Sequence, residues 1–119
     1  MTNSKKLGLW GENIAQDYLN NKGYRFITKN HKEGRFELDI IFKYEQQYIF
    51  IEVKTRNESW GQISDNYLSS RQTNNLKKAI ASYCLKYKIN FENTRLDLIV
   101  ISVNYKKKMA QLKHFLDIL

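Results

Sequence analysis

The sequence of 119 residues contains no proline and only one cysteine. Because it also lacks any glycine- or serine-rich stretch, nothing in it is typical of a linker between domains. We therefore interpret residues 1–119 as a single domain. The lone cysteine, Cys84, excludes an internal disulfide and favours a reducing compartment. Its place in a helical pattern indicates a buried thiol rather than a nucleophile.

Long apolar runs are also missing. No segment approaches the roughly 20 apolar residues that a membrane-spanning helix needs. At the N-terminus, Glu12 interrupts MTNSKKLGLWGENIA before it could form the apolar part of a signal peptide. We therefore expect a cytoplasmic protein that makes no contact with a membrane.

Acidic residues are scarce beside basic ones, with 12 Asp and Glu against 20 Lys and Arg and a net charge of +8. This balance favours a polyanionic partner, nucleic acid before membrane. Aromatic residues are interleaved with the basic clusters, which suits phosphate contacts with some base stacking. A solvated surface explains any single cluster equally well. The clusters are Lys5-Lys6, residues 29–35, Lys77-Lys78 and residues 106–108, and the aromatics include Tyr24, Phe26, Tyr67 and Tyr105.

Apolar periodicity predicts two helices and several strands. Residues 5–22 repeat apolar or small side chains at helical spacing and end at Gly23, a residue typical of the position after a helix. Ser69 or Ser70 is expected to cap a second helix that runs to about Lys88. Strands are predicted at 24–30, 35–43, 47–55 and 95–103, a long loop at 56–69, and a strand or short helix at 109–119. This order predicts an α/β fold with a mixed central sheet of four to five strands flanked by helices.

The second and third predicted strands carry charged residues within apolar sequence, where charges rarely occur unpaired. If the turn between them is centred on Glu45-Gln46, Asp39 lies opposite Glu52 and Glu37 lies opposite Lys54. A slip of one residue would move the carboxylates into the core, so the apolar pattern specifies the register. In that register Leu38, Ile40 and Phe42 share one apolar face, and the charges share the other.

Two opposed carboxylates repel each other, but they supply the oxygen ligands that Mg²⁺ prefers. Lys54, on the same face, could hold a scissile phosphate or stabilise an attacking hydroxide. Glu12 shares a helix face with Gly8 and Ala15, whose small side chains would let this acid approach a metal at the sheet. Simpler interpretations remain open, namely a Glu37–Lys54 ion pair and carboxylates that face solvent.

These motifs resemble the PD-(D/E)xK nuclease superfamily and, within it, the YraN family of endonuclease-like proteins. GLWGENIAQDYLNNKGYRFITKN is similar to the opening of that family, FELDII to its G-E-[IL]-D-L-I motif, and FIEVKTR to its F-V-E-V-K-x-R motif. RLDLIVISV is similar to its R-[FY]-D-[VL]-[VI] strand. The resemblance spans nearly the whole chain and implies one nuclease-like domain with a restriction-endonuclease-like core. The family is related to archaeal Holliday-junction resolvases, which are dimeric and Mg²⁺-dependent, so a homodimer and branched DNA are implied as well.

The resemblance also implies roles for individual residues. Asp39, Glu52 and the Val53 carbonyl would hold Mg²⁺ or Mn²⁺, Lys54 would be the catalytic lysine, and Glu12 would complete the site as a further acid and metal ligand. Glu37 and Gln72 would support the site. Phe36 stands where the family usually has glycine, and Arg95 with Asp97 favours a structural ion pair. The residues expected to hold the nucleic-acid backbone are Arg35, Arg56, Arg71, Lys77 and Lys78.

We therefore expect a metal-dependent endonuclease that hydrolyses DNA phosphodiester bonds and selects branched structure rather than base sequence. The alternative is a nucleic-acid-binding module that keeps the fold and has little or no cleavage activity. Opposed carboxylates argue against that alternative, since binding alone does not need them. A subunit that cleaves only with a partner protein is a third interpretation.

Overall fold

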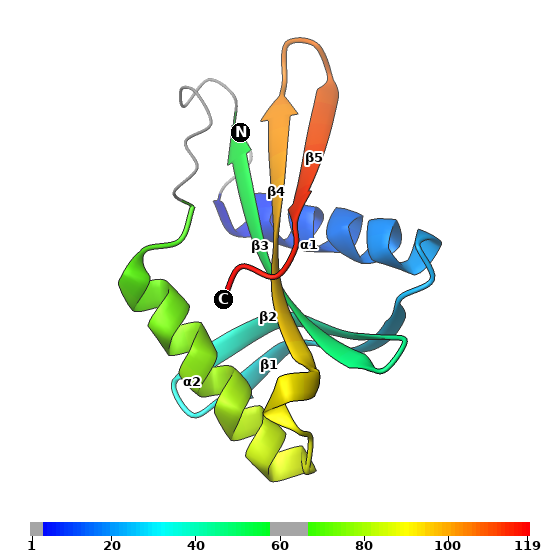
Figure 1. The fold of residues 1–119 in the computed structure, drawn as a ribbon. Helices are drawn as coiled ribbons and strands as arrows, with labels where there is room; N and C mark the ends of the chain where they lie inside the picture. Colours follow the sequence, from blue (N-terminus) through cyan, green and yellow to red (C-terminus); the bar gives the residue numbers. More distant parts are fainter. Residues whose placement is uncertain (1–3, 58–66) are drawn as a thin grey trace.

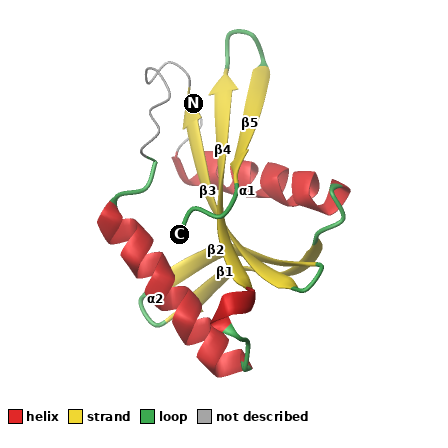
Figure 2. Ribbon diagram, in the orientation of Figure 1, coloured by secondary structure: helices red, strands yellow, loops and turns green. Residues whose placement is uncertain are grey.

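The computed structural model describes residues 4–57 and 67–119, within which it forms two long helices and five strands (Figures 1 and 2). The elements are α1 (Ser4–Asn21), β1 (Arg25–Glu33), β2 (Phe36–Tyr44), β3 (Gln47–Asn57), α2 (Ser70–Tyr87), the 3₁₀ helix η2 (Phe91–Asn93), β4 (Thr94–Asn104) and β5 (Met109–Phe115). Neither long helix of this described part combines the length and apolarity needed to cross a membrane.

The five strands form one mixed sheet in the order β1-β2-β3-β4-β5. β3 and β4 run parallel, and the other neighbouring strands run antiparallel. The predicted α/β fold is therefore confirmed, and it is consistent with a restriction-endonuclease-like core. The final segment forms a strand rather than a helix, and β1 and β3 extend beyond their predicted ends to Glu33 and Asn57. Most of the loop predicted at 56–69 lies outside the described residues.

Each face of the sheet is covered by one helix, and Figure 1 shows α1 and α2 on opposite sides. Ala15 and Leu19 of α1 pack on a cluster that includes Ile99 and Ile101 of β4. On the other face Leu76, Ile80 and Tyr83 of α2 pack against Phe50 and Leu96. β4 lies between the two clusters, which explains why its sequence is apolar without alternation.

The start of α2 and the end of α1 have the capping residues that the sequence predicted. Ser69 is the N-cap of α2: its hydroxyl accepts from the Gln72 N–H at 3.1 Å, and the Gln72 side chain accepts from the Ser69 N–H at 2.9 Å. Gly23 follows α1 with φ of +90°, a conformation that glycine adopts without strain. The N–H of Tyr24 then bonds the Leu19 carbonyl at 3.0 Å, which closes the end of α1.

The hairpin of β2 and β3 has the predicted register at its closed end. Ile41 pairs with Phe50 and Lys43 with Tyr48, around a turn in which Glu45 has φ of +55°. The pairing ends at Ile40–Ile51, beyond which β2 continues beside β1 and β3 continues beside β4. The two strands therefore form a fork, visible in Figure 1 where β3 turns away from β2.

The prediction that Leu38, Ile40 and Phe42 share one face is wrong for Leu38. Ile40 and Phe42 pack on the α1 side, whereas Leu38 packs on the α2 side. Asn30, in the stretch of β1 that runs beside this part of β2, has φ of +52°. A left-handed residue in one strand of an antiparallel pair disturbs the regular alternation. β2 changes faces at Asp39, opposite Asn30, where the fork opens.

The approach of α1 to the sheet depends on Gly11 rather than on Gly8. A Cβ at Gly11 would collide with the side chain of Thr55 on β3, whereas a Cβ at Gly8 would have no neighbour within 4 Å. The expectation that Gly8 permits close approach is therefore wrong, because a side chain at Gly8 would meet no neighbouring atom. Contact through Gly11 brings the first half of α1 beside β3, one residue beyond Lys54.

Alanine substitutions at these two glycines should have opposite effects on stability. Gly11→Ala is expected to lower the free energy of unfolding by about 1–3 kcal/mol, because the new methyl group overpacks the contact with Thr55. Gly8→Ala should raise it by about 0.5–1 kcal/mol through helix propensity alone. Urea denaturation of the two variants measures the difference. Equal changes at the two positions would contradict this account of the helix–strand contact.

A buried ion pair within β4 also bonds residues of β5 and of the C-terminal segment. Asp97 is fully buried and accepts from Arg95 Nε and Nη2, both at 2.8 Å, in a two-pronged contact. His114 Nε2 lies 2.8 Å from the same carboxylate, and the backbone N–H of Asp117 donates to it at 2.9 Å. Arg95 also donates to the Tyr24 hydroxyl at 2.9 Å. The expectation of a structural Arg95–Asp97 ion pair is confirmed.

Candidate functional site

The candidate site lies at the fork between β2 and β3. Asp39 is the first residue of β2 beyond the last pair of the hairpin, and Glu52 is the corresponding residue of β3. Asp39 Oδ2 accepts from the backbone N–H of Val53 at 2.9 Å. This bond spans the opening strands and holds the carboxylate of Asp39 in one orientation.

Asp39 and Glu52 are in direct contact at the fork. Burial raises the pKa of Glu52 to about 9, and charge repulsion from Asp39 and a hydrogen bond between the two carboxyl groups add to the effect. Only 13% of the Glu52 side chain is exposed, so water can do little to relieve the repulsion. The two acids are thus held close together at the fork, where ionising both of them is unfavourable.

Lys54 is the nearest cation to this pair. Its Nζ lies 3.8 Å from Glu52 Oε1, and its side chain is 34% exposed. The alternation of β3 places Lys54 on the same face as Glu52, and the alternative Glu37–Lys54 ion pair is not among the ion pairs of the described residues. Lys54 therefore contacts the acid pair while its ammonium group still reaches solvent.

Glu12 and Glu37 form the outer part of the acid cluster. Burial raises the pKa of Glu12, with charge repulsion from Asp39 and Glu37 as the next causes and Lys29 acting in the opposite direction. With its amide nitrogen turned toward the acids, Asn30 donates to Glu12 Oε1 at 3.1 Å and to Glu37 Oε1 at 3.3 Å. Asn30, whose backbone is left-handed, thus contacts the acid cluster through its side chain.

A cleft of about 160 Å³ opens from the acid pair toward α2. Glu37, Glu52 and Lys54 line it from the sheet, and Gln72 lines it from the first turn of α2. The Gln72 carboxamide oxygen is already engaged in the cap of α2, which leaves its NH₂ group for other contacts. Phe36, at the position where a glycine was expected, forms part of the wall.

The oxygen donors present at the fork fit a divalent cation. Mg²⁺ takes hard oxygen ligands and keeps several waters, so two carboxylates from adjacent strands suffice to hold it. A cation between Asp39 and Glu52 would offset the repulsion that raises the pKa of Glu52. Across residues 4–57 and 67–119, no three Asp, Glu, His or Cys side chains are grouped closely enough to hold a metal. A ligand role for Glu12 or for the Val53 carbonyl therefore stays a prediction.

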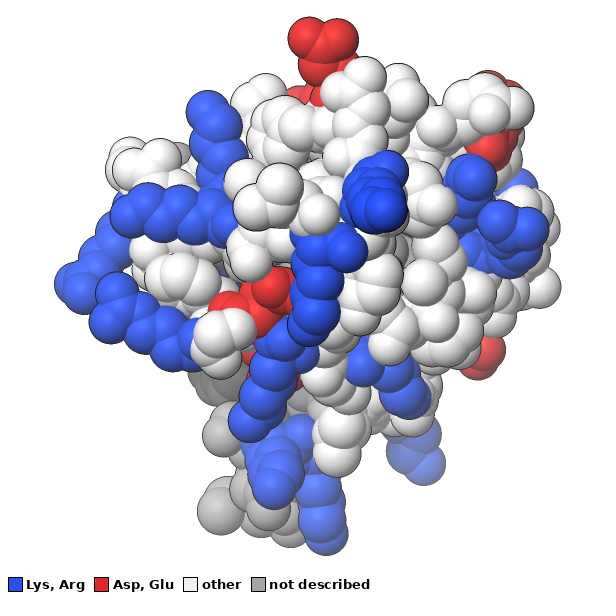
Figure 3. Space-filling view, turned by 90° about the horizontal axis from the view of Figure 1, so that it is seen from below, with Lys and Arg blue, Asp and Glu red and all other residues white. Residues whose placement is uncertain are grey.

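The basic residues predicted to bind nucleic acid come from the turn between β1 and β2, from β3 and from α2. Arg71 is exposed beside Gln72, and Arg35 lies over the ring of Phe36 with 5.4 Å between the guanidinium carbon and the ring centroid. Lys77 and Lys78 are exposed further along α2 and directly follow Asn75 and Leu76, which line the cleft. Arg56 continues β3 beyond Lys54. Figure 3 shows Lys and Arg side chains spread over one face of the molecule with few carboxylates among them.

Asn30 is the site residue that the sequence patterns missed. Asparagine is depleted in strands and tolerates positive φ better than most residues. Its position inside a predicted strand was therefore a usable signal of an irregular backbone.

Sequence comparisons agree with the fold and the motifs described above. The model of the uncharacterised protein family UPF0102 matches residues 11–101, a range that contains Glu12, Asp39, Glu52 and Lys54. The chain belongs to the UPF0102 family. A UPF0102 protein of Syntrophomonas wolfei subsp. wolfei is 31% identical to it over 114 residues, which cover 96% of this chain and 97% of that protein. A UPF0102 protein of Chlorobium phaeobacteroides is 35% identical over 115 residues, which cover 93% of this chain and 91% of that protein.

Membership of UPF0102 agrees with the resemblance to YraN-like proteins, but the family description carries no activity. The relatives are similar to this chain over nearly their whole length. The chemistry of the fork is therefore the basis for inferring what the protein does.

Proposed function

We propose that this protein is a metal-dependent endonuclease of the PD-(D/E)xK superfamily that hydrolyses DNA phosphodiester bonds. The observation that carries the proposal is the contact of the Asp39 and Glu52 carboxyl groups at the fork, with Lys54 beside them. Two carboxyl groups in contact and largely out of water cannot both ionise at low cost unless a cation binds them. A divalent cation supplies the missing partner.

Asp39 and Glu52, with the carbonyl of Val53, would hold Mg²⁺ or Mn²⁺. Such a cation lowers the pKa of a bound water and offsets negative charge on a phosphate. The Val53 N–H keeps the Asp39 carboxylate oriented toward the fork. The Lys54 ammonium group positions the attacking water and stabilises the charge that develops on the phosphate.

The substrate is proposed to be DNA, with branched DNA preferred. A net charge of +8 and a dispersed set of exposed lysines and arginines support backbone contacts that do not depend on base sequence. Binding should therefore weaken steeply with added salt. A homodimer would present two forks to the two strands of a branched substrate, in line with the related Holliday-junction resolvases.

A nucleic-acid-binding module without cleavage activity is the weaker candidate. It would need the basic surface but not a buried pair of carboxylates that raises the pKa of Glu52 to about 9. Keeping such a pair lowers stability without improving affinity for a polyanion.

A cleavage panel tests the proposal. Branched and linear DNAs are incubated with purified protein and Mg²⁺, Mn²⁺ or EDTA, and we expect nicking only with metal, fastest on the branched DNAs. Lys54→Ala should slow cleavage by about 10²–10³-fold, the cost typical of removing one charge-stabilising group. Lys43→Ala, at the closed end of the same hairpin, is the matched control and should cleave as the wild type does.

Absence of cleavage on every substrate with both metals, using protein free of contaminating nuclease, would reject the enzyme and favour the binding module. Cleavage that appears only when cell extract is added would instead indicate a partner protein.

A further inference from the structure

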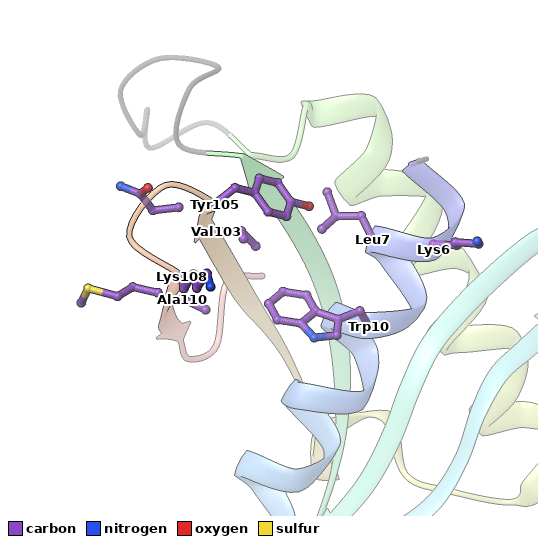
Figure 4. Close-up of a pocket in the computed structure, with 9 residues that line it drawn as sticks. Lys6, Leu7, Trp10, Val103, Tyr105, Lys108 and Ala110 are labelled. Carbon is purple, nitrogen blue, oxygen red and sulfur yellow. The ribbon is translucent and has the colours of Figure 1, made fainter. Parts of the chain in front are cut away.

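An open groove lies between α1 and the β4–β5 hairpin (Figure 4). Its volume of about 520 Å³ exceeds that of the 160 Å³ cleft beside the acid pair. Trp10 of the groove and Glu12 of the acid cluster are two residues apart on α1, so they point to opposite flanks of the helix. The lining residues, among them Leu7, Trp10, Val103, Tyr105, Met109 and Ala110, all fall outside the range 11–101 matched by the family model.

The groove leaves large apolar side chains exposed. Trp10 is 40% exposed, Tyr105 is 49% exposed and Met109 is 57% exposed. In Figure 4 the Trp10 indole and the Tyr105 ring project from opposite walls toward the same space. Exposed apolar side chains that line a groove with a polar rim are typical of ligand-binding and interaction sites.

The charges at the groove indicate which chemical class of ligand could bind there. Lys6 and Lys108 line it, and none of the described lining residues is acidic. Lys5, Lys106 and Lys107 adjoin these two lysines in sequence. Aromatic rings together with lysines suit a partner that is both flat and anionic, and an unpaired nucleotide has both properties.

We infer that the groove binds an unpaired nucleotide of a nucleic-acid single strand. The base stacks on Trp10 and Tyr105, and Lys108 contacts an adjoining phosphate. Stacking of this kind tolerates any base, because every base presents an aromatic face. The ligand is thus a single-stranded segment of the nucleic acid that the proposed function would act on, and the inference rests on that function for its biological context. The binding itself requires no metal.

A second copy of this chain is the alternative occupant, and the charges argue against it. In a two-fold interface the same surface patch meets itself. Lys108 would then face the same lysine of the partner, in a chain that already carries a net charge of +8.

Binding to a fluorescent oligothymidylate of about 12 nucleotides, measured in EDTA, tests the inference. Trp10→Ala and Tyr105→Ala should each weaken binding by about tenfold or more, the effect of losing one stacked base, and should change binding to duplex DNA little. Lys108→Ala should reduce the salt dependence of single-strand binding by about 0.7 in log–log slope, the contribution of one phosphate contact. In a Trp60→Phe background, where Trp10 is the remaining tryptophan, the oligonucleotide should quench its fluorescence.

Phe91→Ala and Lys113→Ala are the matched controls, since both side chains are exposed and lie outside the groove. Circular dichroism verifies that each variant is folded. Wild-type affinity for the oligonucleotide in folded Trp10→Ala and Tyr105→Ala would overturn the inference. Unchanged affinity with a shift from dimer to monomer in light scattering would assign the groove to a second copy. Tight single-strand binding without DNA cleavage would reject the proposed function alone, whereas cleavage with unaffected groove variants would reject only the groove assignment.

Discussion

Glu52→Gln is expected to abolish metal-stimulated DNA cleavage while DNA binding persists. Glutamine retains the shape of the side chain but provides an amide in place of a carboxylate, so the fork keeps only one anionic ligand. A metal ion contributes several kcal/mol of transition-state stabilisation. Its loss should slow nicking by at least about a thousandfold, since each 1.36 kcal/mol is a factor of about ten.

The same variant separates metal binding from catalysis. With Mg²⁺ or Mn²⁺ the wild type should melt at a higher temperature than in EDTA, because a ligand that binds only the folded state stabilises it. Glu52→Gln and Asp39→Asn should lose this shift and yet remain folded in EDTA, because each replaces one of two mutually repelling acids with a neutral amide of similar shape. Glu45→Gln, in the exposed turn of the same hairpin, should retain both cleavage and shift. A full metal-dependent shift in Glu52→Gln would show that Glu52 is not a ligand.

Asp97→Ala is expected to destabilise the protein by about 3–5 kcal/mol, because it leaves the charge of Arg95 largely buried and without its acid partner. The loss should also release the C-terminal segment, since His114 and the Asp117 N–H bond the same carboxylate. Guanidinium denaturation measures the change. Asp17→Ala on the exposed side of α1 is the control, expected within about 0.5 kcal/mol of the wild type.

The contribution of Asp97 should also depend on pH. Burial acts to raise the pKa of Asp97, but hydrogen bonds from His114, Arg95 and the Asp117 N–H outweigh it and lower the pKa below the ordinary 3.8. A depressed acid pKa contributes stability above the unfolded value and loses it as pH falls through the folded value. The stability gap between wild type and Asp97→Asn should therefore be constant near neutral pH and narrow only in acid below 3.8. A gap that stays unchanged throughout that range would contradict the charged state of Asp97.

Short-range patterns in the sequence predicted much of the fold. The alternation of Ile41, Lys43, Tyr48 and Phe50 determines the closed end of the hairpin, because each strand residue points to the face opposite its neighbour. Caps such as Ser69 act through bonds to residues three or four positions away, so their effect is visible in a short stretch of chain. The same local rules brought Asp39 and Glu52 to adjacent positions at the fork.

The remaining features depend on contacts between distant segments. The sequence alone could not show that β2 changes faces at Asp39, because the change appears only where β2 leaves β3 and continues beside β1. Nor could it show that Gly11, rather than Gly8, brings α1 onto β3, since that depends on where Thr55 lies.

By itself the sequence determined most element types, with the final segment left open between strand and helix. It also determined the register at the closed end of the hairpin and the acids at its open end, because each follows from spacing along one or two adjacent segments. Only the tertiary structure decided how far the strands separate, which glycine allows the helix to approach, and that Trp10 meets Tyr105 across a groove lined by lysines. Those outcomes depend on how two helices pack against the faces of one sheet, and side-chain packing between segments far apart in the chain leaves no periodic trace in the sequence.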